Sequence, residues 1–269
     1  MKRVLVTGGS MGIGLAVAQA LASREIELVL VARGEEALQK AVASLEGAGH
    51  SYHAFDVSDE KAWNAVELDE LHGLVCAAAV IEPVGPIGEY APADFKRTLE
   101  VNVLGTLLAV HRCLPALRAG SGSIVAFSGG GATAPLPRFD AYASSKAAVV
   151  RLCENLSTTL APMAINCVAP GFVATRIHEA TFAAGPEAAG SEYYEKTRRE
   201  VEQGGFPASE AAELVCLLLS GVPFTGKLIS AQWDPWRDPA FQQRLADEPN
   251  LATLRRIDGM LFDSVPDER

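Results

Sequence analysis

A glycine-rich turn directly after a short apolar segment constrains this chain more than any other feature. Val4-Leu5-Val6 is typical of a buried strand, and the run T-G-G-S-M-G-I-G follows it at positions 7–14. Glycines at 8, 12 and 14 permit positive φ and a close backbone approach, and the amphipathic run after them predicts a helix whose free N–H groups face the turn. A strand, a turn of this kind and a helix N-terminus together predict a pyrophosphate-binding loop. Its residues are Gly8, Ser10, Met11, Gly12, Ile13 and Gly14.

Apolar segments and helical segments alternate along the rest of the chain. Strands are predicted at 27–32, 53–57, 73–78, 122–127, 165–168 and 227–230, and helices at 35–46, 92–118, 140–160 and 208–219, with a loop-rich region up to about residue 206. This alternation predicts an α/β fold: a doubly wound parallel sheet of the Rossmann type, in three αβα layers, with its ligand site at the carboxyl edge of the strands.

Composition limits the partners of such a domain. The chain has 269 residues, 49% of them hydrophobic, which suits one domain with a full core. A formal net charge of -10 argues against nucleic-acid binding, which needs a basic face. No signal peptide or membrane span is indicated, and five cysteines without C-x-x-C spacing suit a reducing cytoplasm. His50 and His53 lack a third ligand nearby, so no metal is expected.

Further motifs follow in order: Asp56-Val57, Asn102 within V-N-V, the Y-A-S-S-K run from Tyr142 to Lys146, and N-C-V-A-P-G ending at Gly171. With the glycine-rich turn, these motifs make residues 1 to about 230 resemble the short-chain dehydrogenase/reductase family. The resemblance implies an oxidoreductase that interconverts a ketone or aldehyde and an alcohol by hydride transfer with a nicotinamide dinucleotide.

The spacing of Tyr142 and Lys146 places both side chains on one face of a helix. A tyrosine exchanges protons readily at neutral pH only if its pKa falls from about 10 toward 7, which corresponds to roughly 4 kcal/mol. An ammonium about 4 Å away supplies on the order of 4 kcal/mol at an effective dielectric constant of about 20. We therefore expect Lys146 to lower the pKa of Tyr142.

The resemblance adds that Tyr142 gives its proton to a ketone oxygen, that Lys146 also holds the nicotinamide ribose, and that Asn102 sits in a water-linked proton relay. Without the resemblance, Tyr142 could be a surface aromatic and Asn102 a capping amide.

Two departures from the family pattern concern the site. The family usually has a serine 13 positions before its tyrosine, where this chain has Gly129 beside Ser128. Either the strand end is shifted by one residue, so that Ser128 turns inward and serves as the catalytic serine, or the serine is missing; Thr133 is a weaker substitute. The second departure is C-A-A-A at 76–79, where the family usually has N-N-A-G. Small residues still let the cofactor approach, but we expect the loss of the asparagine hydrogen bonds that tie the sheet to the helix carrying Asn102.

Cofactor choice depends on the end of the second strand. An acidic residue there would accept both ribose hydroxyls of NAD, whereas Arg33 after Ala32 offers a guanidinium suited to the 2′-phosphate of NADP(H). Met11 provides no second basic residue, so Arg33 could also be an ordinary surface arginine. By resemblance, Asp56 contacts the adenine and Thr175 the carboxamide. The other cofactor-binding residues implied are Val57, Ala78, Pro170, Gly171 and Val173.

Two segments bear on specificity. Residues 176–205 occupy the place of the family's mobile substrate lid, although the charges around Tyr193, Tyr194, Arg198 and Arg199 could simply face solvent. Residues 231–269 form a C-terminal extension in which Trp233, Trp236 and Arg237 could bind a polar ring such as a sugar, or pin the tail to the domain. Apolar positions 251, 254, 257 and 261 have helical spacing, so we expect this tail to dock on its own or a neighbouring subunit.

These features predict an NADP(H)-dependent carbonyl reductase or alcohol dehydrogenase for a small to medium polar substrate, with carbohydrate-like molecules among the candidates. The alternative is a dinucleotide-binding regulatory or sensor protein with weak or lost catalysis. A nucleotide-sugar epimerase or dehydratase is disfavoured by chain length and by the glycine spacing. A homodimer or homotetramer is expected through the helices at 92–118 and 140–160. Its predicted apolar surface comprises Ala109, Cys113, Val149, Leu152 and Leu156.

Overall fold

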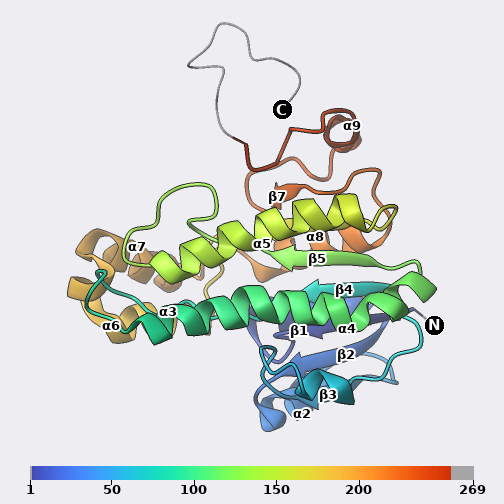
Figure 1. The fold of residues 1–269 in the computed structure, drawn as a ribbon, viewed down its shortest axis with the longest axis horizontal. Helices are drawn as coiled ribbons and strands as arrows, with labels where there is room; N and C mark the ends of the chain where they lie inside the picture. The colour runs from blue at the N-terminus through green and yellow to red at the C-terminus, as the bar shows by residue number, and fades with distance from the viewer. Residues whose placement is uncertain (1, 256–269) are drawn as a thin grey trace, which may run out of the picture.

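A parallel β-sheet forms the centre of the molecule (Figure 1). The computed structural model describes residues 2–255, and within them seven strands pair in the order β3-β2-β1-β4-β5-β6-β7, all parallel. The strands are β1 (Arg3–Thr7), β2 (Glu27–Ala32), β3 (Ser51–Ala54), β4 (Gly73–Cys76), β5 (Ser123–Phe127), β6 (Ile165–Ala169) and β7 (Leu228–Ser230). The doubly wound fold predicted from the sequence is confirmed.

Helices cover both faces of this sheet. They are α1 (Gly12–Ala22), α2 (Glu35–Ala43), α3 (Pro92–Leu99), α4 (Gly105–Ala119), α5 (Asp140–Thr159), α6 (Glu179–Ala189), α7 (Ser191–Glu202), α8 (Ala208–Leu219) and α9 (Pro239–Asp247). Short turns of other helix types lie at Ala62–Ala65, Glu100–Leu104 and Arg176–His178. One core packs α1, α2 and α8 on the first face, and a second packs α4 and α5 on the other.

Strand β1 shows why the sheet is central. Its side chains alternate between the two cores: Val4 and Val6 pack with the α1 and α8 side, and Leu5 with the α4 and α5 side. Because both faces are covered, these apolar side chains are almost free of solvent contact. The parallel arrangement brings the loops that follow β1, β4, β5 and β6 to one edge, where the candidate site lies.

Several predicted element boundaries need correction. The third strand is β3 at Ser51–Ala54, because the chain turns away after Phe55 rather than continuing to Val57. The single helix predicted at 92–118 is α3 and α4, joined by a π-helical turn at Glu100–Leu104. The region expected to be loop-rich contains α6 and α7. These helices were missed because Gly185 and Pro186 interrupt α6, so the sequence has no long run of helical apolar spacing there.

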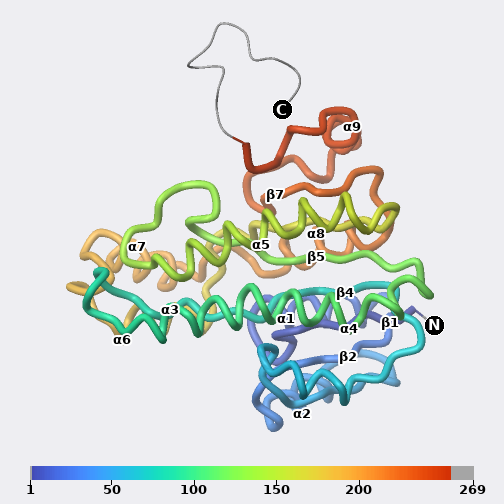
Figure 2. The backbone as a smooth tube through the Cα atoms, viewed as in Figure 1, coloured from blue at the N-terminus to red at the C-terminus, as the bar shows by residue number. Residues whose placement is uncertain are grey.

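The described part of the C-terminal extension packs against its own domain, with α9 beyond β7 (Figure 2). The buried ammonium of Lys227 donates to the carbonyl oxygens of Glu248, Pro249 and Leu251 at 2.7, 3.0 and 3.0 Å. Leu228 N donates to Ala252 O at 2.8 Å, so this segment covers the outer edge of β7. The expected helix is wrong at positions 251 and 254, because 251 lies in a turn and 254 in irregular backbone. Positions 257 and 261 lie outside the described residues.

The prediction of an apolar intersubunit surface is wrong for three of its five residues. Ala109, Cys113 and Val149 lie in the core between the sheet and its covering helices. Leu152 and Leu156 are partly buried, whereas Leu104 and Leu107 of the same layer are 40% and 42% exposed. Among the helices at residues 2–255, none combines the length and apolar character needed to cross a membrane.

Candidate active site

Tyr142 and Lys146 lie one helical turn apart on α5, at the end of the helix nearest the carboxyl edge of the sheet. Phe139 is the N-cap residue of α5 and is fully buried, which anchors this end of the helix. The Lys146 ammonium is buried and donates to the carbonyl oxygen of Phe127 at 2.9 Å, and it lies 5.6 Å from the centroid of the Tyr142 ring. The structure therefore brings the predicted pair together.

The expectation that Lys146 lowers the pKa of Tyr142 is wrong. Burial raises the pKa of Tyr142 well above its ordinary value, and the neighbouring Tyr193 hydroxyl adds to that rise. Burial lowers the pKa of Lys146 to about 8. The ammonium donates to the backbone carbonyl of Phe127, and Lys146 is not among the causes that set the pKa of Tyr142.

Ser128 keeps the register of β5. Phe127 pairs with Val168, and Ser128 N donates to Val168 O at 2.8 Å, so the strand is not shifted by one residue. The Ser128 hydroxyl is buried and has no hydrogen-bond partner within residues 2–255. Gly129 faces the tyrosine instead, because a Cβ there would lie 2.2 Å from the Tyr142 hydroxyl oxygen. Thr133 is exposed and supplies no buried substitute.

Asn102 links the loop after β4 to α5 from the middle of the π-helical turn. Its amide exchanges two hydrogen bonds of 2.9 Å with the backbone of Val80, and Nδ2 also donates to Ser145 Oγ at 2.8 Å. Ser145 in turn donates to Tyr142 O at 2.7 Å. The C-A-A-A run has no asparagine side chain to tie the sheet to this segment, and the hydrogen bonds between Asn102 and the backbone of Val80 form a tie there. Sequence reasoning missed Ser145, although it precedes Lys146 in the Y-A-S-S-K run.

The glycine-rich turn forms a cradle against the loop after β4. Gly8 and Gly12 have φ of +69° and +55°, and a Cβ on Gly8 would lie 2.7 Å from Ala78 N. A Cβ on Gly14 would lie 2.3 Å from Gly8 O, so only glycine fits there. Met11 is the N-cap residue of α1, whose first turn has no acidic side chain. Ser10 precedes Met11, and Ile13 lies in the first turn of α1. The free backbone N–H groups at such a helix N-terminus suit a pyrophosphate.

Asp56 is fixed by neighbours before any ligand arrives. Its carboxylate accepts from Ser58 N at 3.0 Å and from Ser58 Oγ at 2.7 Å, and it forms an ion pair with Arg97. Burial alone would raise the pKa of Asp56, but the Ser58 hydrogen bonds and the Arg97 guanidinium together lower it. Val57 is buried against Gly105. Arg97 was missed, since nothing local in the sequence pairs it with a carboxylate 41 positions earlier.

The remaining predicted cofactor residues lie along the same edge. Arg33 is exposed directly after β2 and makes no ion pair with the part of the chain that the structure describes. Thr175 lies against the glycine turn, because a Cβ on Gly12 would be 3.2 Å from its Cγ2. Buried Pro170 follows β6, Gly171 has φ of +80°, and Val173 bridges to Gly205 at the base of the lid.

Helices α6 and α7, which lie in the segment predicted to be the substrate lid, are found at the α3 and α5 end of the molecule (Figure 1). They pack on the site through a small cluster around Ile81, Phe139 and Ala189, which also contacts Tyr142 and Tyr193. The predicted lid segment therefore packs against the end of α5 that carries Tyr142.

The C-terminal extension is pinned to the domain by two of the residues considered for ligand binding. Trp236 is buried and donates from Nε1 to Ala231 O at 3.1 Å. Arg237 stacks on the Trp236 ring, 3.8 Å from its centroid, and pairs with Glu210 of α8 at 2.8 Å. Trp233 is 79% exposed. Of the two roles left open by the sequence, Trp236 and Arg237 have the structural one.

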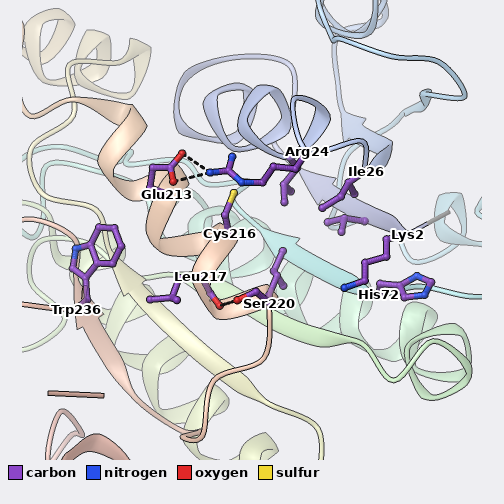
Figure 3. Close-up of a pocket in the computed structure, with 12 residues that line it drawn as sticks. Lys2, Arg24, Ile26, His72, Glu213, Cys216, Leu217, Ser220 and Trp236 are labelled. Carbon is purple, nitrogen blue, oxygen red and sulfur yellow. Dashed lines mark hydrogen bonds and ion pairs between the residues drawn. The ribbon is translucent and has the colours of Figure 1, made fainter. Parts of the chain in front are cut away.

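A separate cavity of about 380 Å³ lies at the opposite edge of the sheet (Figure 3). Lys2, Ile26 and His72 line it, and each precedes the start of a strand. On its α8 side are Glu213, paired with Arg24 at 2.7 Å, and Cys216. This cavity is remote from the predicted catalytic edge.

Comparison with known proteins defines the class of this fold and site. The family described as short chain dehydrogenase matches residues 2–185. The chain belongs to the short-chain dehydrogenase/reductase family of oxidoreductases.

Relatives with known names are moderately similar. Dehydrogenase/reductase SDR family member 4 of Sus scrofa is 34% identical over 190 residues, covering 66% of this chain and 68% of that protein. The 2,3-dihydro-2,3-dihydroxybenzoate dehydrogenase of Bacillus subtilis strain 168 is 33% identical over 239 residues, covering 82% and 89%. The chain thus spans about two thirds of the mammalian relatives and most of the bacterial one.

Solved structures share the fold across most of the chain. A short-chain dehydrogenase/reductase from Saccharomyces cerevisiae superposes with a TM-score of 0.80 at 27% identity, covering 91% of this chain and all of the other. A variant of actinorhodin polyketide ketoreductase, solved with NADPH, gives 0.74 at 26% identity, covering 85% and 95%.

Proposed function

We propose that this protein is an NADP(H)-dependent carbonyl reductase or alcohol dehydrogenase acting on a small to medium polar substrate, carbohydrate-like molecules included. The observation that carries the proposal is the pair of partly buried Tyr142 and buried Lys146 on α5, under a lid and at the edge that holds the glycine cradle. A phenol is protonated at neutral pH, and burial raises the pKa of Tyr142 further. A protonated phenol is the form that can give a proton to a carbonyl oxygen, the proton transfer that carbonyl reduction requires.

The residues at this edge fit a dinucleotide. When bound, it would supply or accept the hydride at its nicotinamide. The backbone from Gly8 to Gly14 would hold the pyrophosphate at the N-terminus of α1. Glycine is required at positions 8 and 14 of this turn, because a Cβ there would collide with neighbouring backbone. Arg33 would contact the 2′-phosphate and Asp56 with Val57 the adenine. Lys146 would hold the ribose and Thr175 the carboxamide.

Arg33→Ala is expected to remove the preference for NADPH. A charge-assisted hydrogen bond contributes about 1.5 to 3 kcal/mol, so NADPH affinity should fall roughly 10-fold to 100-fold while NADH affinity changes little. Fluorescence titration of both cofactors measures this. NADH binding as tight as NADPH in the native protein, unchanged by the substitution, would refute the assignment.

The reductase function is tested by ketone-dependent oxidation of NADPH with a panel of polar ketones and aldehydes. Turnover with at least one of them supports the proposal. The second candidate, a sensor that binds the dinucleotide with weak or lost catalysis, is favoured by Gly129, which offers no hydroxyl at the position of the usual serine. Tight NADPH binding without turnover on any substrate would select it.

A homo-oligomer, either a dimer or a tetramer, is part of the proposal. Leu104 and Leu107 leave apolar surface exposed at the start of α4, where a second copy would cover it. Light scattering at micromolar concentration is expected to give at least twice the chain mass of 28.4 kDa. A monomeric mass would contradict this expectation.

A cytoplasmic location also belongs to the proposal. Each of the five cysteines is a free thiol, and four of them are buried. Unpaired buried thiols suit a reducing compartment.

A further inference from the structure

The site lacks a hydroxyl where the family pattern places one. Gly129 has no side chain, and a Cβ there would lie 2.2 Å from the Tyr142 hydroxyl oxygen, so the tyrosine occupies that space. Ser128 does not compensate by contact with the tyrosine, because its buried hydroxyl has no hydrogen-bond partner within the described chain. A carbonyl oxygen beside Tyr142 would therefore need its second hydrogen-bond donor from another element.

The lid supplies a second phenol to this place. Tyr193 of α7 packs its ring on Phe139, with centroids 4.6 Å apart and planes inclined by 51°. Tyr142 and Tyr193 contact the same cluster, and the closeness of Tyr193 contributes to the raised pKa of Tyr142. Two tyrosine side chains from different elements thus pack on one cluster, close enough for one phenol to affect the other.

Hydrogen bonds hold this part of the lid in position. Arg138, just before α5, donates from Nη1 to the carbonyl oxygens of Glu187 and Ala188 at 2.6 and 3.1 Å. The same arginine accepts from Gly85 N through its own carbonyl at 2.8 Å, which ties the lid to the loop after β4. One turn after Tyr193, the Thr197 side chain is almost completely buried, and its hydroxyl lies beside the Tyr193 phenol, where it opposes the rise that burial causes in the pKa of Tyr193.

We propose that Tyr193 is a further catalytic residue, which donates a hydrogen bond to the substrate carbonyl oxygen in the role that a serine at position 129 would have. The inference rests on the proposed reductase function. During reduction, the carbonyl carbon receives the hydride and its oxygen receives the proton of Tyr142. Tyr193 keeps its own proton and stabilises the negative charge that develops on that oxygen. The donor is part of the lid, so lid closure completes the site.

The test compares Tyr193→Phe with Tyr194→Phe in the NADPH-loaded enzyme, using a ketone that the native protein reduces. Tyr193→Phe keeps the ring packing on Phe139 and removes only the hydroxyl, so kcat is expected to fall about 10-fold to 100-fold with NADPH affinity unchanged. Tyr194 is the matched control, because its ring packs edge-on against Phe182 at 5.7 Å. Tyr194→Phe is expected to keep the native kcat.

Ser128→Ala tests the alternative that Ser128, rather than Tyr193, donates the hydrogen bond to the substrate carbonyl oxygen. Native kcat in Ser128→Ala together with the loss in Tyr193→Phe supports the proposal. Native kcat in Tyr193→Phe overturns it, as does an equal loss in Tyr194→Phe, which would point to lid packing rather than to the hydroxyl. If the native protein reduces no ketone at all, the proposed function fails and this inference with it, whereas turnover that survives Tyr193→Phe overturns the inference alone.

Discussion

Tyr142→Phe is expected to lower the turnover of ketone reduction about 100-fold or more. The protonated phenol of Tyr142 is the proposed proton donor, and the Lys146 ammonium instead donates to the backbone carbonyl of Phe127. Removing the hydroxyl leaves the carbonyl oxygen without its proton donor while the ring still packs in the same cluster. Steady-state oxidation of NADPH with the best ketone of the panel measures the loss.

Two controls separate lost chemistry from lost structure. NADPH should bind Tyr142→Phe as tightly as the native protein, because the glycine cradle is untouched. Tyr90→Phe removes a partly buried hydroxyl that donates to Asp140 at 3.0 Å, at the start of the same helix, and should retain most of the turnover. Native turnover in Tyr142→Phe would exclude the tyrosine as general acid.

Gly14→Ala is expected to weaken NADPH binding about 10-fold to 100-fold. Its Cβ would lie 2.3 Å from the carbonyl oxygen of Gly8, so the turn must move away from its present path. Overpacking of this kind costs about 1 to 3 kcal/mol, and the moved backbone is the part that would face the pyrophosphate. Isothermal titration with NADPH, alongside thermal unfolding, measures both effects.

Gly34→Ala is the matched control for this substitution. A Cβ at Gly34 would lie 3.7 Å from the nearest side chain, which is ordinary contact, and the residue has a negative φ. Binding and melting temperature should therefore remain close to native. Undiminished NADPH binding in Gly14→Ala would show that the turn is not the pyrophosphate site.

The features that could be predicted from the sequence are those with a local physical cause. The glycines of the first turn are spaced for one tight backbone path, and Tyr142 with Lys146 share a helix face through their spacing alone. The parallel sheet followed from the alternation of strands and helices, because parallel strands need helical crossovers. These elements required no knowledge of contacts between distant segments.

What could not be predicted depends on distant contacts. The direction of the pKa change at Tyr142 follows from burial under the lid and from the acceptor that Lys146 finds at Phe127. The pairing of Arg97 with Asp56 joins α3 to the loop after β3. The in-register position of Ser128 is set by β6, which pairs with β5 across a long crossover. In each case the sequence contained the residue types but not their distances.

Transfer of deuterium from NADPH labelled at the nicotinamide C4 tests the central claim most directly. The native protein is incubated with labelled NADPH and the ketone panel, and the alcohol formed is analysed by mass spectrometry. The account predicts one deuterium on the carbinol carbon with the native protein, and a yield reduced about 100-fold or more with Tyr142→Phe. Bound NADPH that transfers no deuterium to any carbonyl of the panel would contradict it.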